Sequence, residues 1–305
     1  MQEILSKRHY RRLFFTIVLV VLAFALLVRF LILPQYDPRL SLDFPAFLAS
    51  LVDNLVVSIF ITVLIGGFIF WVTPDIVRRS QLEIVEPRRI SPLLKEASAT
   101  SKFWIYKGAC GRYTRAVTLP RLAEAARVES IGRDITVCIL NPRNNRLCAE
   151  YATYRRSLGS GSNMSWSQLA VQKEVLATAV LIMKYQFSEP LLRIRLFFVD
   201  SFSAFRLDIS DRYVIVTKED KGASALKADV GTYFYDSYKD DVRLTERLAT
   251  PLPYSPELEF TDVFTESSLL QTLEHARLVD EVMLRQLDVS SLLETVNKPV
   301  NPYSR

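Results

Sequence analysis

A long apolar stretch near the N-terminus constrains this chain more than any other feature of its sequence. Leu13–Leu33 is interrupted only by Arg29 and is followed by Pro34. A helix of this length crosses the roughly 30 Å of hydrocarbon in a bilayer. A secretory signal peptide has a shorter apolar region and a small-residue cleavage site, and this segment has neither. We therefore predict a transmembrane helix at 13–33 and expect an integral membrane protein.

A second apolar run, Leu55–Thr73, is closed by Pro74. Within it the Gly66-Gly67 pair presents a smooth surface that a second helix can approach closely. We predict a second transmembrane helix at about 55–73. Residues 1–75 then form a membrane hairpin in contact with the lipid bilayer.

Basic residues indicate the orientation of this hairpin. The segment between the two runs holds Arg39 alone, whereas eight basic residues flank the pair of runs: Lys7, Arg8, Arg11, Arg12, Arg78, Arg79, Arg88 and Arg89. The positive-inside rule predicts both termini in the cytoplasm and about 20 residues on the outer side. The formal net charge of +5 fits these flanks, and it does not by itself require a nucleic-acid partner.

Two charged residues fall close to the outer ends of the predicted spans. Arg29 lies one turn from the end of the first span, where its side chain can snorkel to the headgroups. Asp53 lies near the start of the second span, so the two residues can also pair across the hairpin. Such a pair is either a structural clasp or part of a polar path that opens on activation. We favour the clasp.

The remainder of the chain has ordinary globular composition and divides into three parts. Residues 76–100, with prolines spaced along them, are predicted to be a connector, and residues 101–248 an α/β domain. Residues 249–305 are predicted to hold a Pro-rich linker and an amphipathic helix at about Ser267–Leu287. Within the α/β domain, expected strands at Phe103–Lys107, Asp134–Leu140 and Leu191–Val199 alternate with expected helices. This alternation predicts a mostly parallel sheet covered on both faces.

The scarcity of histidine and the pattern of cysteines restrict the chemistry available to the chain. Three cysteines with no C-x-x-C pair are typical of a reduced compartment rather than of a disulfide framework. Only two histidines are present, His9 before the first apolar run and His275 near the C-terminus. This argues against a zinc site and against a Ser-His-Asp triad. We expect no cofactor and no metal.

Two loops that follow expected strands are candidate anion-binding sites. The first strand is followed by Gly108, Gly111, Arg112 and Arg115, at the start of an expected helix. Glycines let the backbone approach a ligand, and the free N–H groups of a helix N-terminus favour an anion. The next strand ends in Asn141, Pro142 and Arg143, and in an open α/β sheet both loops fall at the carboxyl edge where ligands bind. A tight turn with solvated arginines fits the same residues, and this alternative stays open.

An expected β-hairpin at Phe205–Thr217 carries a further pattern. Ala204, Arg206 and Asp211 occupy the spacing of the H-x-K-x-x-x-x-D hairpin, and residues 100–245 resemble one repeat of the phospholipase D-like fold. Carried over by position, the nucleophilic histidine of that family falls on Ala204, the lysine on Arg206 and the aspartate on Asp211. The resemblance implies a phosphate-binding fold that has kept a cation and lost its catalysis, because alanine cannot form a phosphoenzyme.

Two membrane helices joined to such a degenerate domain resemble bacterial two-helix antiphage effectors, which are encoded beside retron reverse transcriptases or cyclic-nucleotide synthases. The resemblance implies a non-enzymatic, multi-pass protein of the inner membrane. Its cytoplasmic domain would sense a nucleic acid, a nucleotide or a protein such as a reverse transcriptase complex, and its helices would then form a homo-oligomer and damage the membrane. The alternatives are a membrane-bound phosphodiesterase or nuclease of phospholipase D-like fold, and a passive scaffold.

Overall fold

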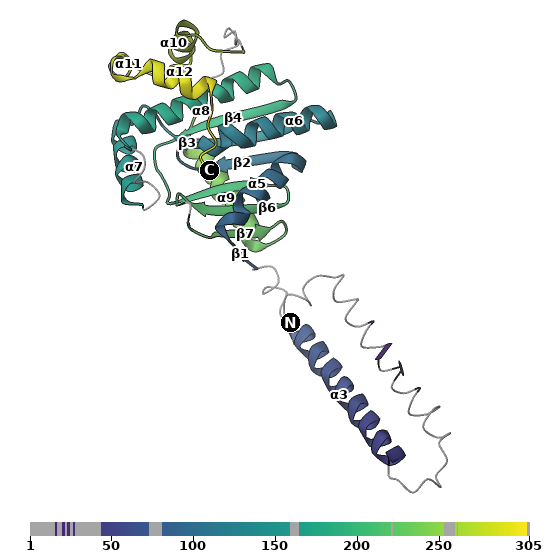
Figure 1. Ribbon diagram of the computed structural model, residues 1–305. Helices are drawn as coiled ribbons and strands as arrows, with labels where there is room; N and C mark the ends of the chain where they lie inside the picture. The colour runs from purple at the N-terminus through teal and green to yellow at the C-terminus, as the bar shows by residue number, and fades with distance from the viewer. Residues whose placement is uncertain are drawn as a thin grey trace. The chain divides into compact units, whose positions relative to one another are not determined.

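The structure, a computed structural model, describes residues 44–72, 81–158, 165–220, 222–252, 260 and 262–303, together with isolated positions between 16 and 27. The chain separates into two compact units, Met1–Arg79 and Ser80–Arg305. We describe each unit by itself, and Figure 1 labels their helices and strands. We call the second the α/β unit.

In the N-terminal unit, one long helix, α3 (Phe44–Val72), is built almost entirely of apolar residues. Its window Ser50–Phe68 has a mean hydropathy of 2.1, and none of that window is buried within the protein. Among the described residues this is the one helix long and apolar enough to cross a membrane. Large side chains such as Phe60 are mostly exposed, which in water would be an unusually extensive apolar surface.

A helix therefore covers the expected second span, and it is longer than predicted. It begins at Phe44 instead of Leu55, so Asp53 lies inside the helix and not at its start. The sequence marks the apolar window, whereas helical hydrogen bonding continues through polar residues beyond it. The first expected span, Leu13–Leu33, lies outside the described residues apart from isolated positions, and so does Arg29. Its pairing with Asp53 remains a prediction.

The α/β unit is built on one eight-stranded mixed sheet with the order β1-β7-β6-β5-β2-β3-β4-β8. The strands are β1 (Glu83–Val85), β2 (Phe103–Lys107), β3 (Arg133–Leu140), β4 (Leu192–Val199), β5 (Phe205–Ser210), β6 (Tyr213–Lys218), β7 (Ala225–Asp229) and β8 (Thr250–Pro251). Only β2–β3 and β3–β4 pair in parallel, while the other neighbours are antiparallel. The prediction of a mostly parallel sheet was wrong, because the hairpin β5–β6 adds to the edge of β2 and extends the sheet on that side.

Helices cover both faces of the sheet (Figure 1). They are α5 (Pro87–Thr100), α6 (Leu119–Glu129), α7 (Asn145–Ser157), α8 (Gln168–Ser188), α9 (Tyr233–Leu248), α10 (Glu266–His275), α11 (Glu281–Gln286) and α12 (Val289–Asn297). Successive side chains of a strand point to opposite faces, and β2 shows which helices lie on each. Lys107 donates to Asp241 of α9, whereas the buried Trp104 and Tyr106 point to the other face.

Helix α8 forms the centre of the core on that other face. All its residues from Val175 to Met183 are buried, as expected for a helix enclosed on all sides. It packs on α7, α12 and β4. The buried strand β3 lies beneath these helices, with Val137, Cys138 and Ile139 inaccessible to solvent.

Two segments differ from the sequence-based expectation. Residues 87–100, expected within a connector, form α5, whose Leu94 and Ala97 belong to the core. The single amphipathic helix expected at 267–287 is instead two short helices, α10 and α11, since Arg277 has a left-handed backbone and Asp280 caps a new helix. A third helix, α12, follows the segment and is capped by Asp288. The apolar spacing was read correctly as helical, but the helix-starting Asp280 inside the segment was overlooked.

Candidate anion-binding cavity

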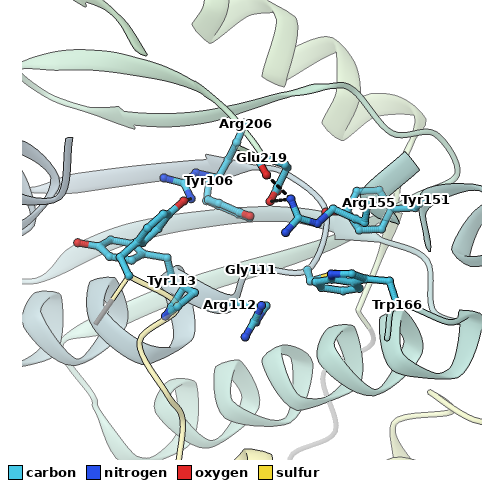
Figure 2. Close-up of a pocket in the computed structure, with 12 residues that line it drawn as sticks. Tyr106, Gly111, Arg112, Tyr113, Tyr151, Arg155, Trp166, Arg206 and Glu219 are labelled. Carbon is cyan, nitrogen blue, oxygen red and sulfur yellow. Dashed lines mark hydrogen bonds and ion pairs between the residues drawn. The ribbon is translucent and has the colours of Figure 1, made fainter. Parts of the chain in front are cut away.

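A small cavity of about 50 Å³ lies where β2 ends, on the face of the sheet that carries α7 and α8. We call it the arginine cavity, after the three arginines that line it (Figure 2). Its wall consists of Tyr106, Cys110, Gly111, Arg112, Tyr113, Tyr151, Arg155, Trp166, Arg206, Glu219, Pro302 and Tyr303. These residues come from β2, the loop after it, α7, the residues before α8, the β5–β6 hairpin and the C-terminal segment.

The loop after β2 owes its shape to two glycines. Gly111 has a φ of +66°, and a Cβ there would lie 2.8 Å from Cγ2 of Thr178 on α8, so both backbone and packing favour glycine. A Cβ on Gly108 would lie 2.4 Å from the hydroxyl oxygen of Tyr106 and 3.0 Å from Cγ of Arg206. The loop thus lies directly against two side chains of the cavity at Gly108, and Gly111 lines the cavity itself. That these glycines serve an anion site remains a prediction.

Arg206 enters the cavity from β5 and is only 5% exposed. Its Nε donates to Asp208 at 2.8 Å, and its Nη1 donates to the hydroxyl of Tyr303 at 3.1 Å. Its Nη2 has no hydrogen-bond partner in the structure. Burial is the largest single influence and lowers the pKa of Arg206, but Asp208 together with Tyr303, Tyr106 and Glu219 outweighs burial and raises that pKa well above its ordinary value. The cavity therefore contains a permanently charged guanidinium with an unused donor.

Arg155 reaches the cavity from α7 on the opposite side, as Figure 2 shows. It is ion-paired with Glu219 at 3.4 Å and also donates to the backbone carbonyl of Glu219. The guanidinium lies 5.0 Å from the centre of the Trp166 ring, a cation–π distance. Its Nε is buried and has no hydrogen-bond partner. A second arginine thus offers a donor in an aromatic surrounding.

The remaining predicted arginines of the first loop have different roles. Arg112 lines the cavity, lies 3.5 Å from Glu174 and stacks over Trp166 at 5.8 Å. Arg115, in contrast, is buried in a structural network, where it pairs with Glu174 and donates to Thr178 at 2.9 Å. Arg115 therefore holds α8 against the loop and does not line the cavity, contrary to our prediction.

The predicted residues after β3 do not reach the cavity. Asn141 donates to Asp200 at 3.1 Å and accepts from the backbone N–H of Arg143 at 3.0 Å. Arg143 is exposed, and both residues line a separate groove beside β8. The loops after β2 and β3 share an edge of the sheet, but their side chains do not converge.

The charges around the cavity are nearly balanced. Four guanidinium groups meet three carboxylates in the ion pairs described above, which leaves a net charge of +1 among these groups. The arginine donors that remain point to binding of a compact anion, because charge-assisted hydrogen bonds are strong in a buried setting. The volume fits one phosphate-sized group.

Burial suppresses the reactivity of two potential nucleophiles in the wall, Cys110 and Tyr106. Burial, followed by the nearby Glu174, raises the pKa of the Cys110 thiol well above its ordinary value, so the unreactive thiol form persists. Burial likewise raises the pKa of Tyr106 well above its ordinary value. Asp211 lies at the far end of β5, where it accepts from the backbone N–H of Lys102 at 2.9 Å. Within the described part of the chain, no cluster of three or more potential metal ligands occurs.

Much of the wall was not predicted from the sequence. Tyr106 and Tyr113 lie beside the predicted loop, and their closeness to it along the chain is the one feature of the sequence that could have pointed to them. Arg155, Trp166 and Tyr303 lie on distant segments, and only their packing places them at the cavity. The buried arginine and the tryptophan are residue types enriched at binding surfaces.

Comparisons with known proteins assign no family to the chain. No protein-family model matches the sequence, and no curated protein is significantly similar to it. A solved structure that resembles part of it is that of TrmBL2, an archaeal chromatin protein with a novel mode of DNA binding. It is 11% identical, and the match covers 68% of this chain and 67% of the other, with a TM-score of 0.34. A TM-score this low establishes neither a shared fold nor a shared role.

Proposed function

We propose that this protein is a membrane-anchored, non-enzymatic effector of bacterial antiviral defence. Its α/β unit binds an anionic trigger on the cytoplasmic side, and its membrane helices then associate and disrupt the inner membrane. The trigger is a nucleotide, a nucleic acid or a protein complex that carries one, such as a reverse transcriptase with its product. The protein acts as a homo-oligomer in its active state.

The observation that carries the proposal is the arginine cavity itself. Arg206 and Arg155 present unused donors, while burial keeps the Cys110 thiol and the Tyr106 hydroxyl protonated by raising the pKa of each. A site of this kind favours recognition over turnover. The apolar helix α3 in the same chain supports an output at the membrane.

The suggested phospholipase D-like ancestry supports the same function. Arg206, at the position of that family's lysine, projects into the cavity, while the histidine position holds Ala204. A cation suited to a phosphate is thus retained where the nucleophile is missing. We expect the purified protein to lack phosphodiesterase activity, and measurable turnover would favour the alternative of a membrane-bound phosphodiesterase.

Membrane disruption requires several copies, because two helices enclose no lumen for water or ions. The Gly66-Gly67 pair is the proposed contact between copies. Within the part of the chain that the structure describes, a Cβ at either glycine would meet no atom within 4 Å outside the adjoining turns of α3 itself. Substitution there therefore creates no clash at Cβ with the other described residues.

The test measures dye entry and membrane potential in cells after overexpression or phage challenge. Gly66→Leu with Gly67→Leu should still insert, since leucine is favourable in lipid, but should abolish leakage by blocking close approach. The matched control, Gly66→Ala with Gly67→Ala, keeps the surface small and should retain most of the leakage. Equal leakage from the leucine variant rejects this interface, and no leakage under any trigger rejects the effector function.

A further inference from the structure

Tyr303 lies between two separate hollows of the α/β unit. On one side it closes the arginine cavity. On the other it forms part of the wall of an open groove of about 790 Å³ between α5 and the end of β6. That groove is lined by Glu86, Pro87, Arg88, Ile90, Ser91, Leu94, Thr217, Lys218, Asp220, Gly222 and Tyr303.

The contacts of Tyr303 in the cavity are made by its ring and its hydroxyl. The hydroxyl accepts from Arg206, and the ring meets that of Tyr113 edge to face at 5.4 Å between centroids. The segment before it adds little burial, because residues 298–300 are exposed and follow the end of α12. The side chain of Tyr303 is thus held in the cavity by contacts with Arg206 and Tyr113, at the end of a segment whose residues 298–300 are exposed.

The phenol of Tyr303 occupies a position suited to a ligand oxygen. It accepts a hydrogen bond from a buried guanidinium whose Nη2 has no partner. A phosphate oxygen at the same place would gain more from Arg206 than a neutral hydroxyl does, because both partners would be charged. Tyr303 therefore resembles an internal occupant of an anion site.

The groove on the other side is suited to the organic part of a ligand. Its wall combines the apolar Ile90 and Leu94 with polar groups, and Thr217 in it has a buried hydroxyl oxygen without a hydrogen-bond partner. Ligand sites commonly join an apolar surface to a few polar groups of this kind. Displacement of Tyr303 would make one continuous site of cavity and groove.

We propose that these two hollows form one composite site for a phosphate monoester of mononucleotide size, and that Tyr303 is its built-in gate. The phosphate group binds in the arginine cavity, and the remainder of the ligand lies in the groove. This inference rests on the proposed function, since it names the class of trigger and the way in which the anion site is controlled.

The charges and dimensions select a monophosphate. The cavity accommodates one phosphate group, and the groove has no excess of positive charge to hold two more, because Glu86 and Asp220 in its wall are balanced by Arg88 and Lys218. The gate weakens the binding of every ligand by the same factor. A ligand must replace Tyr303, so its apparent affinity is the intrinsic affinity multiplied by the fraction of molecules in which the gate is open.

The test is titration of the full-length protein in detergent with adenosine 5′-monophosphate, inorganic phosphate and adenosine 5′-triphosphate. Tyr303→Ala should bind the monophosphate at least tenfold more tightly than the wild type, and the triphosphate should bind more weakly in both proteins. Tyr303→Phe, which loses only the hydrogen bond to Arg206, should show a smaller gain. Arg206→Lys added to Tyr303→Ala should remove most of the gain, because lysine lacks the forked donors.

The outcomes separate this inference from the proposed function. Equal affinity of the wild type and Tyr303→Ala for the monophosphate overturns the gate but leaves anion sensing intact. Inorganic phosphate bound as tightly as the monophosphate by Tyr303→Ala overturns the composite site. Variants whose melting temperature equals that of the wild type are taken as correctly folded. If none of these binds any probe, both this site and the anion-sensing part of the proposed function are rejected. The leakage experiment still tests the membrane part.

Discussion

The guanidinium Nη1 of Arg206 and the hydroxyl of Tyr303 lie 3.1 Å apart, although 97 positions separate the two residues in the chain. Strand β5 supplies one partner and the C-terminal segment supplies the other. The contact joins the element that carries the suggested phosphate-binding cation to a segment that no sequence motif marks. It makes the C-terminal segment part of the arginine cavity.

The ion pair of Arg206 with Asp208 predicts a strong asymmetry in mutational stability. Both side chains are almost completely buried and lie 2.8 Å apart. Arg206→Ala leaves a buried carboxylate without its partner and should destabilise the protein by about 3–5 kcal/mol. Arg206→Met with Asp208→Leu removes both charges and should cost far less. Urea unfolding of the three proteins measures the difference, and an equal loss in the single and double variants would contradict this account.

Gly111 and Gly231 form a matched pair for separating backbone strain from steric clash. Both have positive φ, +66° and +82°, but a Cβ on Gly231 meets nothing within 4 Å. Gly231→Ala should therefore cost only the left-handed backbone penalty, about 1–2 kcal/mol. Gly111→Ala should cost about 1–3 kcal/mol more, because its Cβ overlaps the methyl group of Thr178. Thermal unfolding measures the loss of stability in each variant. Similar losses in the two variants would show that the loop containing Gly111 can shift to accommodate a Cβ without further cost.

The buried cysteines predict a loss of stability at alkaline pH. Burial raises the pKa of Cys138 and of Cys148 to about 12, above the ordinary value of 9.0 that the unfolded chain has. Above pH 9 the unfolded state releases these protons and the native state does not, so stability falls as pH rises. The stabilisation is complete below pH 9 and is lost between pH 9 and about 12, at about 1.4 kcal/mol per pH unit for each thiol.

Denaturation midpoints at pH 8, 9, 10 and 11 test this dependence. Cys138→Ala with Cys148→Ala should remove the contribution of the thiols to the fall in stability with pH. The buried tyrosines should still lower the stability above pH 10. In the native wild type, a thiol-specific reagent should label neither cysteine at pH 8, and unfolding should expose both. Rapid labelling of the native protein would show that these thiols are not enclosed.

The basic flanks predict that the C-terminus lies in the cytoplasm. Eight lysines and arginines flank the two apolar runs, and Arg39 alone lies between them. A reporter that is active only in the periplasm should be silent when fused after Arg305 and active when inserted near Arg39. The reverse pattern would overturn the orientation and would place the arginine cavity on the wrong side for an intracellular trigger.

The local features of this protein could be predicted from its sequence. The apolar window within α3 was identified from hydropathy, because a helix that can cross a membrane consists of about 20 consecutive apolar residues, which are visible directly in the sequence. Strands β2, β3 and β4 were located within a residue or two, β3 from its β-branched apolar run, and the glycine-containing turn after β2 was recognised from Gly108 and Gly111. Arg206 was identified from the hairpin pattern. Each of these signals lies within one element or one turn.

Tertiary structure alone decided the rest. The antiparallel arrangement of the four strands beyond β2, the burial of Arg115 against Glu174 and the separation of Arg143 from the cavity all depend on which segments pack together. Arg155, Trp166 and Tyr303 come from three further segments, and no spacing rule relates them. The sequence determined which side chains carry charge and which elements form, whereas long-range packing decided which charges meet, because contacts between distant segments depend on the whole core and not on local periodicity.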